Sequence, residues 1–298
     1  MRDAAYLVQG LGYRYLWIDA LCIVQDSKDD WLSEASKMSS IYKDAVVTIA
    51  VADADDHSQG IFRKRRGRCM RPFHVPYLKG KPYRERGQAD GEGEYYVFPK
   101  NNLVGAGARP KGTLDTRGWI LQEQLLSTRI LYYDHGEIYW DCITVSASES
   151  SPILTSLLDE TDPDETWALK LVRRTLAGQT TDDTLRARIS DAWLEIIKNY
   201  SARELTRQSD KLIAMEGILD SLKGPLQEEH IAGMWRYELW RQLTWWARSP
   251  APTVSTDDES NHGFPAPSWS WLSATGPVCY HSSIPEEDTR LRHGSQKH

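Results

Sequence analysis

The sequence predicts an α/β fold with a parallel sheet and flanking helices, followed by a mainly helical region. Residues 14–21 are almost continuously apolar, as in a strand that is buried on both faces. A helical pattern at 29–43 and a β-branched run at 45–52 follow, and this strand–helix–strand order implies parallel pairing. Later in the chain, apolar residues recur at helical spacing over 165–177, 183–199, 208–223 and 230–247.

Local signals predict the other elements. Residues 1–11 have the pattern of a helix that ends at Gly12, because glycine readily takes the left-handed conformation that follows many helices. Trp269 and Trp271 alternate as in a strand, so both are expected to face one side and to pack on the helical region. The remaining elements are a short strand near 95–98, a helix at 115–126 and strands at 129–133 and 137–142.

Composition divides the chain and limits its partners. A first domain is expected over 1–145, a linker over 146–164 and a mainly helical region over 165–298, with a flexible segment near 249–267. The net charge of −6 gives no general attraction to nucleic acid or to an anionic membrane. The sequence contains no run of 18 apolar residues, the length needed to cross a membrane. Its four cysteines do not have the spacing of a metal site. We therefore expect a cytoplasmic protein without a metal site.

Glu34 is the most informative charge in the sequence. On a helix over 29–43, a set of apolar residues gathers on one side, and Glu34 is the only charge among them. The members of this set are Trp31, Ala35, Met38, Ile41 and Tyr42. A carboxylate on a buried face is costly unless it is paired or used in chemistry. Two interpretations follow: a structural ion pair with an arginine, or a residue of a functional site.

Neighbouring residues would share that site. Ligands of open α/β sheets bind beyond the carboxyl ends of the strands, where Asp19 and the loop from Cys22 to Asp30 are expected. Asp19, Asp26 and Glu34 would then converge on one pocket. Asp19 either orients a ligand hydroxyl or caps the next turn. Cys22 is either a nucleophile or, as the apolar surroundings favour, a buried structural cysteine.

A second lone charge follows in the helix predicted at 115–126. On a helical wheel Glu123 lies between Trp119 and Ile120, again within an apolar arc. An ion pair with Arg117 or Arg129 is the favoured explanation, and it would fix this helix against the sheet. If Arg117 instead points into the pocket, its guanidinium suits a phosphate or pyrophosphate group.

Four blocks of this sequence resemble one family of proteins, in the order in which the family has them. The first spans Tyr15 to Asp26 and continues through Trp31, Glu34 and Tyr42, and the second runs from Thr116 to Cys142. The later blocks are Tyr200-Ser201-Ala202-Arg203 with Asp210-Lys211-Leu212, and Ala266-Pro267-Ser268-Trp269-Ser270-Trp271. Together they closely resemble the fungal heterokaryon incompatibility (HET) domain and the region that follows it. The family's first strand, with an Ala-Leu-Ser-Tyr-like segment, is absent, so the resemblance implies that residues 1–145 lack the N-terminal part of the domain.

The resemblance also implies a fold and a chemistry. HET domains are regarded as distant relatives of the Toll/interleukin-1 receptor (TIR) domain, which implies a TIR-like or flavodoxin-like sheet. TIR domains that cleave NAD carry a glutamate after a tryptophan on the corresponding helix, so Glu34 would be catalytic and would stabilise the oxocarbenium-like state. NAD is then a substrate, and no cofactor is implied. The residues expected to bind it are Asp19, Cys22, Asp26, Trp31 and Arg117, with Trp119, Glu123 and Arg129 structural.

The biological role implied by the resemblance is non-self recognition that triggers regulated cell death when incompatible hyphae fuse. Two mechanisms remain open from the sequence. In one, the domain hydrolyses NAD. In the other, it is a signalling scaffold that self-associates and recruits other incompatibility or death-signalling proteins, and Glu34 and Glu123 are then purely structural.

Overall fold

The computed structural model describes residues 1–52, 54, 60–62, 73–74, 96–97, 111–134, 137–149, 165–178, 184–205, 210–248 and 266–280. The chain divides into two compact units that are each assembled from separate segments. Unit 1 comprises Met1–Cys22, Ala45–Leu114 and Thr128–Asp159, and unit 2 comprises Ile23–Asp44, Asp115–Ser127 and Glu160–His298. Most of the predicted linker and of the predicted flexible segment lies outside the described residues, and the predicted domain boundaries stay a prediction.

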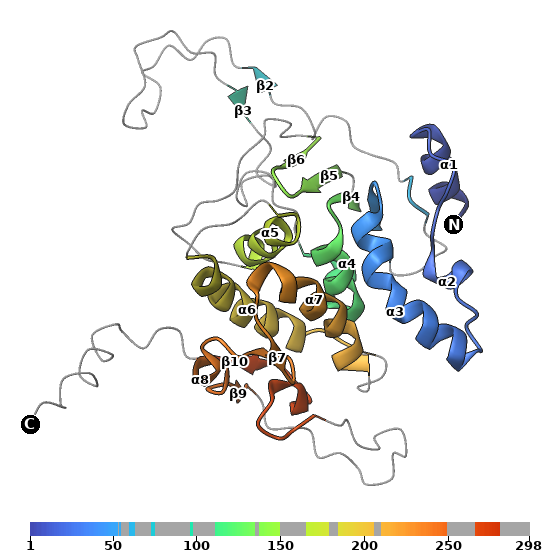
Figure 1. Cartoon of the computed structure of the whole chain (residues 1–298). Helices are drawn as coiled ribbons and strands as arrows, with labels where there is room; N and C mark the ends of the chain where they lie inside the picture. The colour runs from blue at the N-terminus through green and yellow to red at the C-terminus, as the bar shows by residue number, and fades with distance from the viewer. Residues whose placement is uncertain are drawn as a thin grey trace, which may run out of the picture. The chain divides into compact units, whose positions relative to one another are not determined.

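Unit 1 is built on a four-stranded mixed sheet with the order β1-β4-β5-β6, of which Figure 1 labels β4, β5 and β6. Its strands are β1 (Thr48–Val51), β4 (Arg129–Asp134), β5 (Glu137–Cys142) and β6 (Ser146–Ser148). β1 pairs in parallel with β4, whereas the β4–β5 and β5–β6 pairs are antiparallel. The predicted α/β class is confirmed. The prediction of a parallel sheet is wrong beyond the β1–β4 pair, because the connections from β4 to β5 and from β5 to β6 are only a few residues long and such connections join antiparallel strands.

The described residues of unit 1 form one buried cluster beside the sheet. Ala52, Ile130 and Tyr132 are buried together, and the half-buried residues packed against them are Ala50, Leu114 and Tyr139. The helix predicted over 1–11 is confirmed as α1 (Arg2–Gly10), and Gly12 follows it at φ 82°. Asp3 of this helix accepts a 2.9 Å hydrogen bond from the backbone N–H of Ile61. A two-stranded ribbon consists of β2 (Phe73–His74) and β3 (Tyr96–Val97).

The strand predicted at 14–21 does not form. Residues 14–18 have no regular structure, and Asp19–Cys22 form the short helix α2. Local hydrogen bonds explain the difference: the N–H groups of Leu21 and Cys22 both donate to the Ile18 carbonyl, at 2.9 and 2.8 Å. The apolar side chains of this segment are largely exposed, with Tyr15 at 85%. An apolar run of this length does not by itself distinguish a strand from a helical turn.

Unit 2 is a bundle of helices around α4 (Gly118–Leu126). This helix contacts α3, α5 and α7, and Figure 1 shows it among them. Seven of its nine residues are buried, including Gln122 and Gln124, so the helix is enclosed on most of its sides. The other long helices are α3 (Lys28–Asp44), α5 (Glu165–Leu176), α6 (Leu185–Ser201) and α7 (Asp210–Leu226). The helices predicted at 29–43, 165–177, 183–199 and 208–223 are therefore confirmed.

The helix predicted at 230–247 is wrong. A hairpin of β7 (His230–Ile231) and β8 (Met234–Trp235) occupies its start, followed by α8 (Leu239–Gln242) and by β9 (Trp246–Ala247), which pairs with β10 (Val278–Cys279). Ala232 and Gly233 join the hairpin strands at φ 48° and 79°. Positive φ at both central residues is the geometry of a two-residue hairpin turn, which breaks the helix.

The expected strand through Trp269 and Trp271 is also wrong. Trp271 begins a short 3₁₀ helix (Trp271–Ser273) and is completely buried, whereas Trp269 is 43% exposed. The two rings therefore lie in different environments, and only Trp271 packs into unit 2. Among the described helices, none combines the length and the apolar character needed to cross a bilayer.

Candidate functional site

Glu34 lies on the inner side of α3, as its place in the apolar arc predicts. The helix starts after Ser27, whose Oγ accepts a 3.2 Å hydrogen bond from the N–H of Asp30. Ala35 and Met38 are the buried residues of α3, and the Glu34 side chain beside them is 20% exposed. The carboxylate is thus partly withdrawn from water, which is the condition that makes an unpartnered carboxylate costly.

The partner of Glu34 comes from its own helix. Lys37 Nζ lies 2.7 Å from Glu34 Oε1. The hydrogen bond that Lys37 donates to Glu34, together with the negative charge of Glu34, raises the pKa of Lys37. The ion pair expected for Glu34 is therefore present, with a lysine in place of an arginine. Because Lys37 is exposed, the pair contributes little to the stability of the fold.

Trp31 links α3 to α4. Its ring and that of Trp119 meet edge to face, with centroids 6.0 Å apart and planes at 87°. The structural role expected for Trp119 stays a prediction, which this contact supports. Within α4, Trp119 and Glu123 are the two residues that are not buried. Glu123 therefore lies with Trp119 on the side of α4 that is not buried, and the wheel did not identify the inner face of this helix.

Arg117 precedes α4, and its side chain is exposed. The backbone of its two neighbours, Thr116 and Gly118, forms the contact that holds the start of the helix. The N–H of Gly118 donates a 2.8 Å hydrogen bond to the Glu204 carbonyl, and the Glu204 N–H donates to the Thr116 carbonyl. A Cβ at Gly118 would overlap the side chain of Leu205, so glycine is required for this close approach. Two of the recognised sequence blocks thus meet here.

Arg203 is a buried residue whose contacts sequence reasoning missed. Its guanidinium donates to Asn199 Oδ1 at 2.8 Å, to Gln124 Oε1 at 3.0 Å and to the Arg117 carbonyl at 3.4 Å. It therefore binds α6 to the start and the middle of α4. The available signal was its place in the block Tyr200-Ser201-Ala202-Arg203, which resembles the family.

The other predicted site residues are divided between the units. Asp19 and Cys22 are exposed residues of α2 in unit 1, and Asp26 is exposed in unit 2. Asp19 Oδ1 accepts a 2.7 Å hydrogen bond from the N–H of the next residue, Ala20, and both roles expected for Asp19 stay predictions. The expectation of a buried Cys22 is wrong, because the segment that carries it is not a buried strand. Convergence of these residues with Glu34 on one pocket stays a prediction.

Arg129, the third residue expected to be structural, also lies in unit 1. It begins β4, where it pairs in register with Cys142 of β5, and its side chain is exposed. Glu123, its expected ion-pair partner, lies in unit 2. Within the described ranges, no group of three or more His, Cys, Asp and Glu residues could hold a metal ion.

The two downstream sequence blocks meet in the core of unit 2. Lys211 is 5% exposed, and its Nζ donates a 2.7 Å hydrogen bond to the Ala274 carbonyl and lies 5.2 Å from the centre of the Trp271 ring. Burial lowers the pKa of Lys211 to about 8. The Tyr200 hydroxyl donates to the Lys211 carbonyl at 2.9 Å, and the Tyr200 ring meets that of Trp271 edge to face. These blocks therefore have a packing role.

Comparison with known proteins identifies the first part of the chain. Residues 1–123 match the family model described as Heterokaryon incompatibility protein (HET). No curated protein and no solved structure matches the chain. The matched region contains both Glu34 and Trp119, and it contributes segments to unit 1 and unit 2. Residues 1–123 of this chain are therefore similar to the heterokaryon incompatibility (HET) domain.

Proposed function

We propose that this protein acts in heterokaryon incompatibility as a signalling scaffold, which recognises non-self after the fusion of fungal hyphae and triggers regulated cell death. The match of residues 1–123 to the HET family carries the biological role. The scaffold mechanism rests on surface chemistry of unit 2. Its partners are further copies of the chain and other incompatibility or death-signalling proteins in the cytoplasm.

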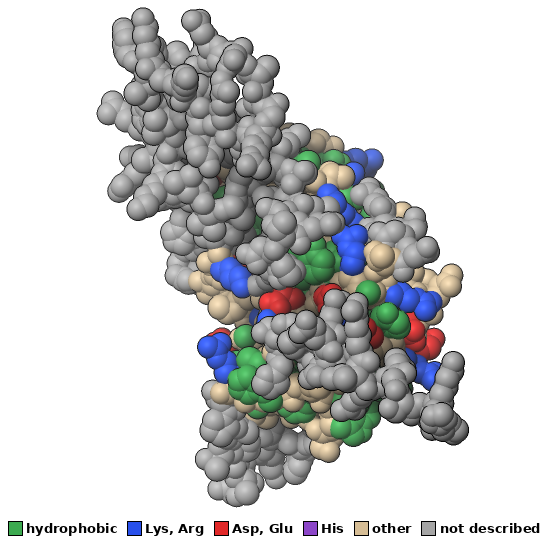
Figure 2. Space-filling view, turned by 90° about the vertical axis from the view of Figure 1, so that its left-hand side faces the viewer, with side chains coloured by type: hydrophobic (Ala, Val, Ile, Leu, Met, Phe, Trp, Pro, Cys, Tyr) green, Lys and Arg blue, Asp and Glu red, His purple; other side chains and the backbone are tan. Residues whose placement is uncertain are grey.

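An aromatic patch supports the scaffold mechanism. We define it as Tyr237, Trp240, Leu243, Trp246 and Trp269, which are between 37% and 54% exposed. Trp245 donates a 2.7 Å hydrogen bond from its indole to the Trp269 carbonyl, so the two parts of the patch are adjacent. Figure 2 shows unit 2 from the side on which Figure 1 places α8, and hydrophobic side chains gather there in the lower half. Exposed clusters of tryptophan and tyrosine are typical of protein-binding surfaces.

The rim of the aromatic patch favours a second copy of the chain as the first partner. Arg241 Nη1 lies 2.7 Å from Glu238 Oε2, and Arg241 Nη2 lies 2.6 Å from Asp191 Oδ1. Both signs of charge therefore border the same apolar surface. A two-fold symmetric dimer brings each sign opposite the other, which gives complementarity without a different partner.

Light scattering on the purified chain at increasing concentration tests self-association. We expect a dimer or larger assembly that Trp240→Ser weakens, because that ring is the most exposed of the aromatic patch. Tyr6→Ser is the matched control, since Tyr6 is 71% exposed and belongs to unit 1. A wild-type chain that stays monomeric at every concentration would contradict the scaffold mechanism.

The family role has its own test. Expression of the chain in a filamentous fungus should arrest growth or kill the cells. Trp240→Ser should reduce that effect, whereas Tyr6→Ser should not. Unimpaired growth with a stable, folded protein counts against the proposed role in cell death.

A second candidate function is hydrolysis of NAD, with Glu34 as the catalytic carboxylate. The observation that favours it is the position of Glu34: on the inner side of α3, 20% exposed and one turn after Trp31. In this mechanism Glu34 stabilises positive charge on the ribose as the bond to nicotinamide breaks. Arg117 suits the pyrophosphate, and Asp19, Cys22 and Asp26 complete the binding residues.

Nicotinamide release from NAD, measured at high protein concentration, separates the two mechanisms. If Glu34 is catalytic, Glu34→Ala abolishes release. Lys37→Met is the control, because it removes the same 2.7 Å ion pair and leaves the carboxylate in place. Loss of release in both variants assigns a structural role to the pair, and no release from the folded wild type leaves the scaffold mechanism.

A further inference from the structure

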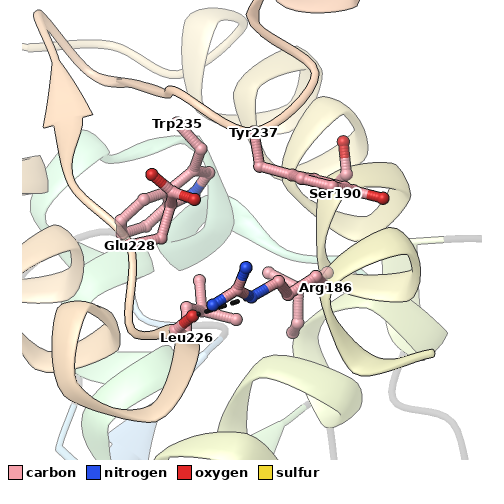
Figure 3. Close-up of a pocket in the computed structure, with 7 residues that line it drawn as sticks. Arg186, Ser190, Leu226, Glu228, Trp235 and Tyr237 are labelled. Carbon is pink, nitrogen blue, oxygen red and sulfur yellow. Dashed lines mark hydrogen bonds between the residues drawn. The ribbon is translucent and has the colours of Figure 1, made fainter. Parts of the chain in front are cut away.

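The pocket between α6, the end of α7 and β8 is too small for a ligand other than water. Figure 3 shows Ser190, Trp235 and Arg186 around it. Its lining is almost wholly apolar, and it has room for about one water molecule. Unpaired backbone groups that a partner can reach are found instead in unit 1, at the first strand of its sheet.

That strand, β1, lies at an edge of the sheet. In the order β1-β4-β5-β6 it has β4 as its one neighbour among the described strands. The N–H of Ala52, which follows β1, donates a 2.8 Å hydrogen bond to the Tyr133 carbonyl of β4. Alternate residues of a strand direct their backbone groups to opposite sides, so Ala50 and Ala52 face β4. Ile49 and Val51 therefore point their N–H and C=O groups away from β4, and we call this side of β1 the open edge.

The open edge has no hydrogen-bond partner within the described ranges. Its residues Ile49 and Val51 are half-buried, so their backbone stays within reach of another chain. An unpaired edge is a template for a further strand, and many proteins protect such edges with proline or charged residues. β1 contains neither. At the other edge of the sheet, in contrast, Ser146 and Ser148 of β6 are buried.

Residues 13–18 are the kind of segment that such an edge accepts. Their sequence, Tyr-Arg-Tyr-Leu-Trp-Ile, has three aromatic residues and a β-branched one, a composition typical of strands. Residues 14–18 have no regular structure, and the Tyr15 and Leu16 side chains are 85% and 37% exposed. The backbone N–H groups of Arg14, Tyr15 and Leu16 make no hydrogen bond within the described part of the chain. The segment therefore lacks a strand partner.

Local hydrogen bonds fix both ends of this segment. The N–H of Tyr13 donates to the Val8 carbonyl at 3.0 Å, and the N–H groups of Leu21 and Cys22 donate to the Ile18 carbonyl. These bonds join the segment to α1 and α2, in a position where it does not pair with β1 of its own chain. Its middle residues remain available to the open edge of another copy.

We propose that residues 13–18 of one copy add as an extra strand to the open edge of β1 in a second copy. The outward N–H and C=O groups of Ile49 and Val51 then have backbone partners, and exposed apolar side chains of the segment are covered. Strand addition of this kind takes its affinity from main-chain hydrogen bonds. The inference rests on the self-association proposed above, and it places a second contact in unit 1, whereas the aromatic patch belongs to unit 2.

A fluorescent peptide of residues 12–19, added to the full chain, tests the open edge directly. Fluorescence anisotropy measures its binding. A peptide with Tyr15→Pro and Leu16→Pro lacks two neighbouring N–H groups, one of which faces the edge in any pairing. The matched control carries Tyr15→Ala and Leu16→Ala, which keep both N–H groups. We expect saturable binding of the native peptide, and binding of the proline peptide at least about tenfold weaker than that of the alanine peptide.

A pair of variants in β1 assigns the contact to the open edge. Ile49→Pro removes one outward N–H, and a proline whose nitrogen faces away from the neighbouring strand is compatible with an edge. Ile49→Ala is the matched control, because it loses the side chain and keeps the N–H. Peptide binding to Ile49→Pro should be at least about tenfold weaker than to Ile49→Ala. Circular dichroism verifies the fold, and the peptide pair on the wild-type chain decides if Ile49→Pro does not fold.

Light scattering of the full chain separates strand addition from the aromatic patch. Tyr15→Pro/Leu16→Pro should weaken self-association at least about tenfold relative to Tyr15→Ala/Leu16→Ala. If Trp240→Ser weakens the assembly and the prolines do not, the scaffold mechanism stands and strand addition is overturned. If the prolines weaken it and Trp240→Ser does not, strand addition stands and the role of the aromatic patch is wrong.

Two results with the peptides also overturn the proposal. One is the absence of saturable binding of the native peptide, because the open edge is then closed, for instance by residues 13–18 of the same chain. The other is equal binding of the proline and alanine peptides, which means attachment through side chains and not through a strand.

Discussion

Unit 1 and unit 2 differ in how completely they bury their large side chains. Among the described residues, the largest fully buried side chains include Trp193, Trp271 and Tyr200, all in unit 2, and Ile130 is the only one of the set in unit 1. Exposed apolar side chains occur in both units: Tyr6 and Tyr15 belong to unit 1, and Trp240 and Trp246 belong to unit 2. A family match alone does not reveal this difference, because residues 1–123 contribute to both units.

Part of the region that matches the HET family packs against the downstream chain. Its helices α3 and α4 contact α7, which lies beyond the matched region. Arg203 and Glu204, also downstream, bind the start of α4 through hydrogen bonds. The part of the domain that carries Glu34 and Trp119 is therefore packed against the downstream helices. We expect substitutions at this contact between the matched region and the downstream helices to lower the stability of the protein.

Trp271→Ala should give the largest effect. The side chain is completely buried, donates a 3.1 Å hydrogen bond to the Gly233 carbonyl, and packs on Tyr200. Removal of a buried tryptophan costs roughly 3–5 kcal/mol, from lost contacts and from the cavity that remains. Urea unfolding of the full chain measures the change. A loss below about 1 kcal/mol would mean that unit 2 lacks the dense core described above.

Lys211 predicts a dependence on pH that is specific to unit 2. Burial lowers the pKa of Lys211 from 10.5 to about 8 in the folded protein. Between these values the unfolded chain holds a proton that the folded chain has released, so the free energy of unfolding rises with pH. The rise is at most about 1.4 kcal/mol per pH unit, and below pH 8 both states hold the proton and the slope vanishes.

Lys211→Met isolates this contribution. The difference in unfolding free energy between the wild type and Lys211→Met should increase by about 3 kcal/mol from pH 8 to pH 10.5. Other groups titrate equally in both proteins and cancel. A constant difference over this range would show that the hydrogen bond to Ala274 keeps the lysine charged at its ordinary pKa.

Gly217→Ala tests the contact between the HET helices and α7. A Cβ at this position would overlap the amide of Gln122 in α4 and lie 2.9 Å from the Cβ of Ser39 in α3. Overpacking costs typically 1–3 kcal/mol, against a gain of about 1 kcal/mol from the helix propensity of alanine. We expect a net loss of roughly 1 kcal/mol by urea unfolding.

Gly224→Ala is the matched control on the same helix. A Cβ there meets nothing within 4 Å, so the substitution should be neutral or stabilising by up to about 1 kcal/mol. Equal effects of the two substitutions would show that α7 does not pack closely on α3 and α4, and the allocation of these helices to unit 2 would then be wrong.

The sequence predicted the long helices and the strands at 129–133 and 137–142 because their periodicity extends over several turns or pairs. The predictions failed where tertiary contacts or local hydrogen bonds determine the conformation of the backbone. The helix predicted at 230–247 becomes a hairpin because Ala232 and Gly233 adopt positive φ, which helical periodicity does not report. The strand predicted at 14–21 becomes a helical turn that bonds to the Ile18 carbonyl.

The candidate site was predictable to a similar degree. The inner position of Glu34 follows from the spacing of the apolar residues of α3, and the structure agrees. Its partner Lys37 was not predicted, because a helical wheel places a residue by its Cα and ignores the reach of a long side chain. The pocket at Ser190 and Trp235 joins residues 45 positions apart, and no local pattern signals such a contact.

Tyr15→Ala should give the smallest effect and is the sharpest test of the comparison. The side chain is 85% exposed, so its removal should change the free energy of unfolding by less than about 0.5 kcal/mol. Ile130→Ala is the control from the core of the same unit, where a residue 1% exposed should cost roughly 2–5 kcal/mol. The apolar pattern of residues 14–21 predicts the opposite for Tyr15, since a tyrosine in a doubly buried strand would cost about as much as Ile130. A large loss of stability in Tyr15→Ala would therefore support the buried strand that the sequence predicts and would remove the contrast between the two units. A negligible loss would confirm that this segment contributes little to the core.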